Sequence, residues 1–126
     1  MNLPKAARLR RRREFLRVQQ RGTRLHAGDV VVIALPAGGR VPRIGITVSS
    51  KIGNAVVRNQ VKRWVREAYR ATRADWPPVD LVVIARSTAP TAGLAGIRRA
   101  LAAARARLGE HPGPAPSGGP SGGARA

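Results

Sequence analysis

The stretch Lys51–Arg70 reads KIGNAVVRNQVKRWVREAYR, and it decides the fold of this chain. Its Gly53-Asn54 pair is typical of the end of an extended segment, with Asn54 as the N-cap of a helix that begins near Ala55. At about 100° per residue, one stripe of this helix, roughly 100° wide, is apolar. That stripe consists of Val57, Val61, Trp64, Val65 and Ala68. The rest of the circumference carries five cations and an amide: Arg58, Asn59, Lys62, Arg63, Arg66 and Arg70. The pattern predicts a helix that packs on a core with one side and presents a phosphate-binding surface with the other.

The charge balance points to a polyanionic partner. The chain has 126 residues, enough for one domain, and a formal net charge of +18 from 24 Lys plus Arg against 6 Asp plus Glu. Compositional bias would explain Arg in place of Lys, but it does not explain the scarcity of acids. Such an excess repels itself in the folded state, and a nucleic acid is the usual partner that compensates for it. An anionic membrane surface is the second alternative.

The sequence excludes several classes of protein. It has no cysteine, which excludes disulfides, thiolate zinc sites and a cysteine nucleophile. No apolar run approaches the ~20 residues that span a bilayer. The segment Met1–Arg13 lacks the apolar region of a secretory signal and leads directly into the first expected helix, so we expect it in the mature protein and the protein in the cytoplasm.

The pattern along the rest of the chain predicts alternating helices and strands. The expected elements are a basic arm over 1–12, a helix over 12–20 that ends at Gly22 in the left-handed conformation, strands over 29–35, 43–49 and 80–86, and a last helix over 92–108. A further short strand over 23–26 is left open. The Gly/Pro/Ser-rich segment 109–126 is expected to be a disordered tail. Residues 1–108 then form a single-domain α+β sandwich in the order α-β-β-α-β-α, or α-β-β-β-α-β-α with the extra strand.

Two segments carry further expectations. In the strand over 43–49, Ile44, Ile46 and Val48 face one way, and Gly45 on the other side leaves room for a helix or a ligand, with packing against a helix favoured. The last helix carries four arginines, for which a solvated face is favoured over RNA contact: Arg98, Arg99, Arg105 and Arg107.

The acids and histidines do not form the pattern of a protein nuclease. Such an enzyme needs clustered carboxylates for metal ions or a histidine pair for acid–base work. The six acids are scattered, at Glu14, Asp29, Glu67, Asp75, Asp80 and Glu110. Of the two histidines, His26 is expected at the surface and His111 in the tail. We conclude that the polypeptide has no catalytic residues of its own.

The segment GITVSSKIGNAVVRNQVKR, residues 45–63, resembles the signature of the bacterial ribonuclease P protein component, approximately G-[IL]-x-V-S-[KR]-K-x-G-N-A-V-x-R-N-R-x-K-R. Arg8-Leu9-Arg10, Glu14-Phe15 and Arg21-Gly22 are similar to the first helix of that family, and 80–86 is similar to its last strand. The resemblance covers nearly everything up to Leu108.

The resemblance implies a function and a fold. The function is that of a small protein bound to a catalytic RNA, which together remove the 5′ leader of precursor tRNA by endonucleolytic cleavage, with Mg²⁺ held mainly by the RNA. The catalytic centre then lies in the RNA, and one protein monomer joins one RNA. The fold is an α/β sandwich with a left-handed βαβ crossover around the basic helix, against the usual right-handed rule.

The resemblance also implies two sets of site residues. Those expected to face the catalytic RNA are Lys51, Asn54, Arg58, Asn59, Lys62, Arg63 and Arg66. A cleft between the first helix and the sheet is expected to receive the single-stranded leader, with Phe15, Arg12 and Arg17. The chain departs from the family pattern at Gln60 and Ser50, where basic residues are usual, and at Gln19 and Ile33, where aromatics are common. Since only four aromatics are present, leader contact is expected to rely on charge and apolar surface more than on stacking.

Three alternatives use the same residues differently. A ribosomal or general RNA-binding protein would need the same charge and helix. A self-sufficient nuclease would cleave without an RNA subunit. A helix-turn-helix DNA binder is disfavoured, because strands rather than helices flank the basic helix.

Overall fold

The computed structural model describes residues 7–110 of the chain. Their helices and strands, in chain order, are α1 (Arg12–Arg21), β1 (Thr23–Ala27), β2 (Val30–Pro36), β3 (Ile44–Thr47), the 3₁₀ turn η2 (Ser50–Ile52), α2 (Ala55–Ala71), the 3₁₀ turn η3 (Arg73–Asp75), β4 (Val79–Ala85) and α3 (Ala89–Glu110). The predicted order is confirmed with its extra strand, β1. Most of the expected tail, 111–126, and the first half of the arm, 1–6, lie outside the described residues.

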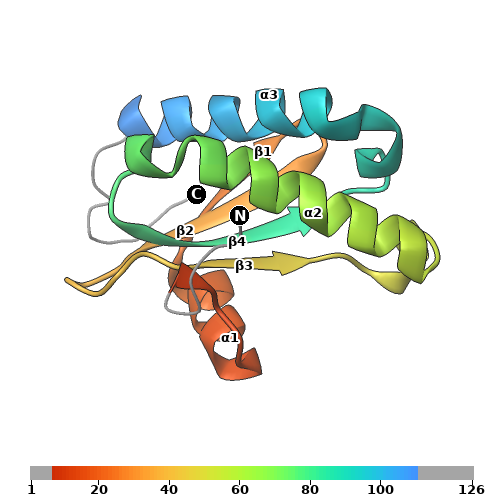
Figure 1. Ribbon diagram of the computed structural model, residues 1–126. Coiled ribbons are helices and arrows are strands. Elements are labelled where there is room, and N and C mark those ends of the chain that lie inside the picture. The colour runs from red at the N-terminus through yellow and green to blue at the C-terminus, as the bar shows by residue number, and fades with distance from the viewer. Residues whose placement is uncertain (1–6, 111–126) are drawn as a thin grey trace.

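The four strands form one mixed sheet in the order β1-β2-β4-β3. β1 pairs with β2, and β2 with β4, in antiparallel fashion, whereas β3 runs parallel to β4 with Ile44 opposite Leu81 and Thr47 opposite Ile84. The parallel pair needs a crossover connection, which α2 supplies. The chain passes from β3 through α2 to β4 in the left-handed sense that the resemblance implies (Figure 1).

The sheet separates two apolar clusters. α2 and α3 lie together over one face, and the short α1 lies under the other (Figure 1). The larger cluster joins Val61, Val65 and Tyr69 of α2 to Ile97 and Leu101 of α3 and to the sheet. A smaller cluster joins Leu9 and Val18 to Val31, Ile33 and Val82. α2 is therefore fixed along one whole side, and its opposite side is free for a partner.

The buried side of α2 agrees with the predicted stripe and extends beyond it. Val61, Val65 and Ala68 are buried, and Val57 and Trp64 are partly buried. Tyr69, which the stripe did not include, is only 1% exposed. At about 100° per residue, Tyr69 lies between Arg58 and Lys62 around the helix, so burial reaches into the cationic side.

The end of α1 corrects the prediction for Gly22. This residue has φ −81° and ψ 166°, which is extended and not left-handed. A Cβ at this position would lie 2.6 Å from the Val18 carbonyl oxygen and 2.7 Å from Cγ2 of Ile33. Gly22 is therefore required by close packing where the chain turns from α1 into β1, and not by backbone conformation.

The basic arm is not a free extension over its described part. Ala7 and Leu9 are buried, and the Leu9 N–H donates to the Ile44 carbonyl oxygen at 2.9 Å. Arg8 forms a parallel bridge with Ile44. Arg8 and Leu9 thus lie along the outer edge of β3.

The last helix begins earlier than expected, at Ala89, and is interrupted at Gly93, where φ is +68°. Its long segment runs over 94–110, close to the prediction. Among residues 7–110, no helix is long and apolar enough to cross a membrane.

Candidate nucleic-acid interface

Two side-chain caps order the chain at the start of α2, one for α2 itself and one for the 3₁₀ turn η2 before it. Oδ1 of Asn54 accepts a hydrogen bond from the Val57 N–H at 3.0 Å, which confirms Asn54 as the N-cap. One turn earlier, Oγ of Ser49 accepts from the Lys51 N–H at 3.1 Å and begins η2. These bonds satisfy backbone donors that a helix start leaves open. Lys51 and Asn54 are both exposed at this end of α2.

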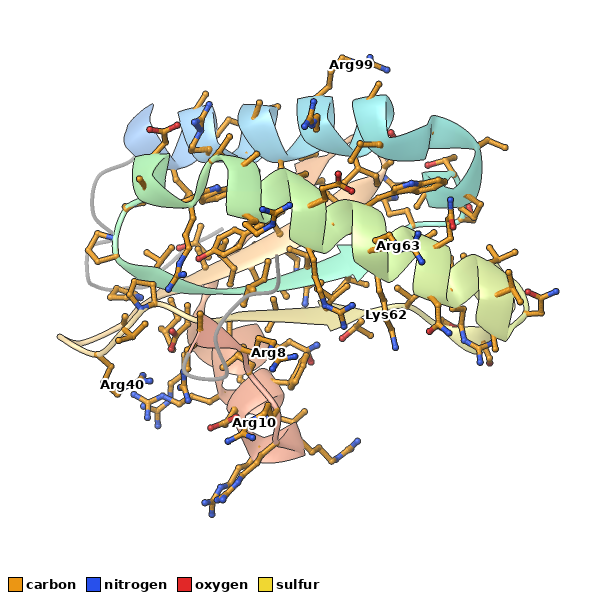
Figure 2. All side chains as sticks on the ribbon, in the orientation of Figure 1. Arg8, Arg10, Arg40, Lys62, Arg63 and Arg99 are labelled. Atoms are coloured by element: carbon orange, nitrogen blue, oxygen red, sulfur yellow. The ribbon has the colours of Figure 1, made fainter. Side chains whose placement is uncertain are left out.

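Beyond the caps, α2 presents what we term the cationic face. It consists of Arg58, Asn59, Lys62, Arg63, Arg66 and Arg70. With 3.6 residues per turn, these six positions fall within an arc of about 140°. Asn59, Arg63, Arg66 and Arg70 are exposed, whereas Arg58 and Lys62 are partly buried beside the core. Figure 2 shows Lys62 and Arg63 extending from the exposed side of α2. All five helical residues of the predicted RNA-facing set therefore share one surface.

The charges of the cationic face are not neutralised within the described part of the chain. Four ion pairs form among residues 7–110, and none includes a residue of α2. Arg58 alone is partly engaged, because its Nη1 donates to the Gly53 carbonyl oxygen at 2.8 Å. Guanidinium groups without carboxylate partners can bind phosphates in bidentate fashion.

The predicted leader-cleft residues lie on the other face of the sheet. Phe15 packs against the smaller apolar cluster and remains partly exposed, together with Leu35 and Ile84. Arg12 and Arg17 are both exposed on α1. At about 100° per residue, Arg12 lies about 60° from Phe15 around the helix and Arg17 about 160°. α1 thus brings Arg12 to the same side as the ring, whereas Arg17 lies on the far side.

One charged network was not anticipated from the sequence. Asp80, 1% exposed, accepts from the Arg43 N–H at 3.0 Å and from Nη2 of Arg40 at 3.1 Å. Nη1 of Arg43 also donates to Oε2 of Glu14 at 2.9 Å. The only local signal is that Asp80 is the one acid in an otherwise apolar strand, near its start. These paired arginines stabilise the base of α1 and are poor candidates for phosphate binding.

Glu14 is held as a carboxylate by its contacts in this network. Its Oε1 accepts the backbone N–H groups of Arg11 at 3.0 Å and Arg10 at 2.9 Å. These two bonds, with the smaller influence of Arg43, lower the pKa of Glu14 to about 2. The carboxylate is therefore charged at any physiological pH.

The solvated face expected for the four arginines of α3 is found for two of them. Arg98 and Arg99 are exposed, and Arg99 points away from α2 and the sheet (Figure 2). Arg105 pairs with Asp75 at 3.4 Å, and Nη1 of Arg107 donates to the His26 carbonyl oxygen at 2.7 Å. Two of the four arginines thus have protein partners.

The described side chains do not fit a resident metal ion. Among residues 7–110, no three of the residue types His, Cys, Asp and Glu come together as a possible metal site. His26 is exposed on β1. What the surface offers is an array of donors for phosphates along α2 and an apolar patch beside α1.

Comparisons with known proteins point to one family. The sequence profile of the ribonuclease P family matches residues 3–109. The ribonuclease P protein component of Citrifermentans bemidjiense is 42% identical over 107 residues, which is 85% of this chain and 92% of that protein. The corresponding protein of a Geobacter species is 41% identical with the same coverage.

Two solved structures have the same fold. The ribonuclease P protein of Staphylococcus aureus superposes with a TM-score of 0.74 at 30% identity, over 84% of this chain and 97% of that one. The ribonuclease P protein of Thermotoga maritima gives 0.71 at 35% identity, over 79% and 96%.

Proposed function

This chain belongs to the bacterial ribonuclease P protein family, and on that premise we propose how its surfaces divide the work between two RNAs. Ribonuclease P is an endoribonuclease that matures the 5′ end of tRNA, and the chain is its protein subunit. The subunit works with the ribonuclease P RNA. The proposal concerns which residues contact which RNA.

The cationic face of α2 binds the ribonuclease P RNA. The observation that carries this proposal is that its charges have no carboxylate partners among the described residues, although Arg40, Arg43 and Arg105 elsewhere do. An RNA helix offers mainly phosphates and 2′-hydroxyls to such a surface. Lys51 and Asn54, which precede the first turn of α2, extend the contact toward the N-terminal end of the helix.

The apolar patch around Phe15 contacts the leader of precursor tRNA. Phe15 is held over β3 by its contact with the sheet and keeps part of its ring exposed, with Arg12 on the same side of α1. A base stacked on an aromatic ring contributes about 1–3 kcal/mol, and a nearby arginine adds attraction for the adjoining phosphate. Arg17, on the far side of α1, contacts neither group in this arrangement.

In this proposal the protein supplies positive charge, and the catalytic centre lies in the RNA. No group of three candidate metal ligands forms among residues 7–110, and the proposal assigns Mg²⁺ to the RNA. A cationic surface between two polyanions lowers their mutual repulsion and so lowers the Mg²⁺ concentration that they need. One chain per RNA, acting in the bacterial cytoplasm where tRNA precursors are processed, completes the proposal.

Reconstitution tests the proposal. The full chain, added to a bacterial ribonuclease P RNA at low Mg²⁺, should restore cleavage of a precursor tRNA, whereas the protein alone should cleave nothing. The triple variant Lys62→Ala, Arg63→Ala, Arg66→Ala should lose this effect, and the matched pair Arg98→Ala, Arg99→Ala should retain it. No gain from the unmodified chain would favour a general RNA-binding protein. Cleavage without RNA would favour a self-sufficient nuclease.

A further inference from the structure

A hollow of about 460 Å³ opens at the carboxyl end of α2, away from the capped start of the helix. Its wall includes Pro42, Tyr69, Arg70, Arg73, Trp76 and Pro77. The volume lies within the range of about 300–1,000 Å³ that is usual for small-ligand sites. None of these residues belongs to the surfaces assigned above except Arg70.

The floor of the hollow is apolar and held in place. Tyr69 and Trp76 are 1% and 8% exposed, with ring centroids 6.2 Å apart. Nε1 of Trp76 donates to Oγ1 of Thr72 at 3.2 Å, and that hydroxyl donates to the Ala68 carbonyl oxygen at 3.2 Å. Together with the partly exposed Pro42 and Pro77, these groups give the hollow an apolar floor.

The rim of the hollow is cationic. Arg70 is exposed and Arg73 partly buried, and neither pairs with a carboxylate among the described residues. Arg73 lies near the Tyr69 hydroxyl, whose pKa is raised by burial against the opposing influence of that arginine. The hydroxyl is therefore neutral at physiological pH. An apolar floor beside two guanidinium groups fits a ligand that is flat at one end and anionic at the other.

The hollow continues the cationic face. Arg70 follows Arg66 by one helical turn and lies about 40° from it around α2. From Asn54 to Arg70 the helix rises about 24 Å, so a phosphate backbone that follows α2 reaches the hollow at its end. This continuity favours RNA over an acidic peptide, because one RNA backbone can contact both the cationic face and the rim of the hollow.

We propose that this hollow binds one unstacked nucleotide of the ribonuclease P RNA. The base lies against the floor formed by Trp76 and the prolines, and its phosphate accepts hydrogen bonds from Arg70 and Arg73. The proposal rests on the assignment of α2 to that RNA, and it adds a separate contact at the far end of the helix.

Tethered cleavage tests the placement, and the absence of cysteine makes single-site labelling straightforward. Ala74, an exposed residue of the same wall, is changed to Cys and coupled to an iron chelate that cuts nearby RNA. In the reconstituted holoenzyme, Ala74→Cys should give discrete cuts. Gln60→Cys, exposed on α2, should also cut, at other nucleotides, and Ala103→Cys, exposed on α3, should give none.

The outcomes separate the two proposals. Cuts from position 60 without cuts from position 74 would overturn the nucleotide site and leave the α2 interface standing. Absence of cuts from both positions would overturn both.

Affinity for the RNA provides the second measurement. Arg73→Ala removes the rim charge and Ala74→Trp fills the hollow, so each should weaken binding of the full chain to ribonuclease P RNA by about fivefold or more. Arg99→Ala should change it less than about twofold. Unfolding temperatures that match the unmodified chain establish that both variants fold. Unchanged affinity in both folded variants would overturn the proposal.

Discussion

The ring of Phe15 lies directly against the backbone of Gly45, so that a Cβ at position 45 would stand 2.5 Å from Cε2 of the ring. The same Cβ would lie 3.0 Å from Cβ of Leu9. α1, β3 and the N-terminal arm therefore meet at a point where only a hydrogen atom fits. The open position that the sequence indicated at Gly45 is occupied by a helix side chain.

Gly45→Ala should destabilise the fold by about 1–3 kcal/mol, because the ring must move or β3 must shift to accept the methyl group. Urea unfolding monitored by circular dichroism measures the change. Adding Phe15→Leu, which removes the ring atoms nearest to Gly45, should recover part of the loss. An alanine variant as stable as the unmodified chain would contradict the close contact.

Phe15→Ala should reduce the preference of the holoenzyme for precursor tRNA over mature tRNA, since the exposed part of the ring is the proposed leader contact. Binding of both RNAs to reconstituted holoenzyme measures the preference. Val18→Ala is the matched control, because Val18 lies on the same helix but is only 1% exposed. It should cost stability without changing the preference. Equal loss of affinity for both tRNAs in Phe15→Ala would contradict a leader contact.

Lys62→Ala should weaken binding to ribonuclease P RNA by about threefold to tenfold and lower the slope of log affinity against log salt by about one. The physical reason is the loss of one phosphate contact and of the counterion that it displaces. Titrations at several KCl concentrations measure both quantities. Arg99→Ala, which removes an equal charge from the outer side of α3, should change neither the affinity nor the salt slope. A larger effect of Arg99→Ala than of Lys62→Ala would contradict an interface on α2.

Glu14 should make the fold sensitive to acid. Its folded-state pKa is about 2 against an ordinary value of 4.5, so the carboxylate stabilises the fold fully above pH 4.5. This contribution is lost as pH falls from 4.5 to about 2. Because the group is partly solvated, we expect about 1–2 kcal/mol.

Urea unfolding of the unmodified chain and of Glu14→Gln measures this effect. The difference in stability between them should be constant above pH 5 and should shrink toward pH 2. Asp75→Asn, which removes an exposed carboxylate, should show little difference at any pH. A Glu14→Gln difference that does not change with pH would contradict the assigned pKa.

Local signals in the sequence were sufficient for the helix that carries the interface. The N-cap at Asn54, the apolar stripe through Val61 and Val65, and the cationic residues between them all depend on spacing within five turns of one helix. For the same reason the alternation in β3 was read correctly. The left-handed crossover came from the family resemblance alone, because spacing contains no information about handedness.

Contacts between distant segments were not accessible in the same way. Asp80 is buried by arginines about 40 residues earlier in the chain, and nothing in the neighbourhood of either identifies the other. Gly22 was assigned to a left-handed helix end because that is where glycine is commonest, whereas Ile33 and the Val18 carbonyl leave it no room for a side chain. The hollow beyond α2 likewise depends on Pro42 meeting residues 69–77, a contact that no local pattern predicts.

The position of Arg8 and Leu9 beside β3 has a consequence for handling the protein. The Leu9 N–H donates a hydrogen bond to the Ile44 carbonyl oxygen on the outer edge of β3. At the opposite edge of the sheet, Arg107 donates a hydrogen bond to the His26 carbonyl oxygen. Unprotected strand margins recruit further strands from other molecules and lead to insoluble assemblies. Trimming the chain to begin at Arg10 would expose the edge of β3. The trimmed chain should precipitate at concentrations at which the untrimmed chain stays in solution.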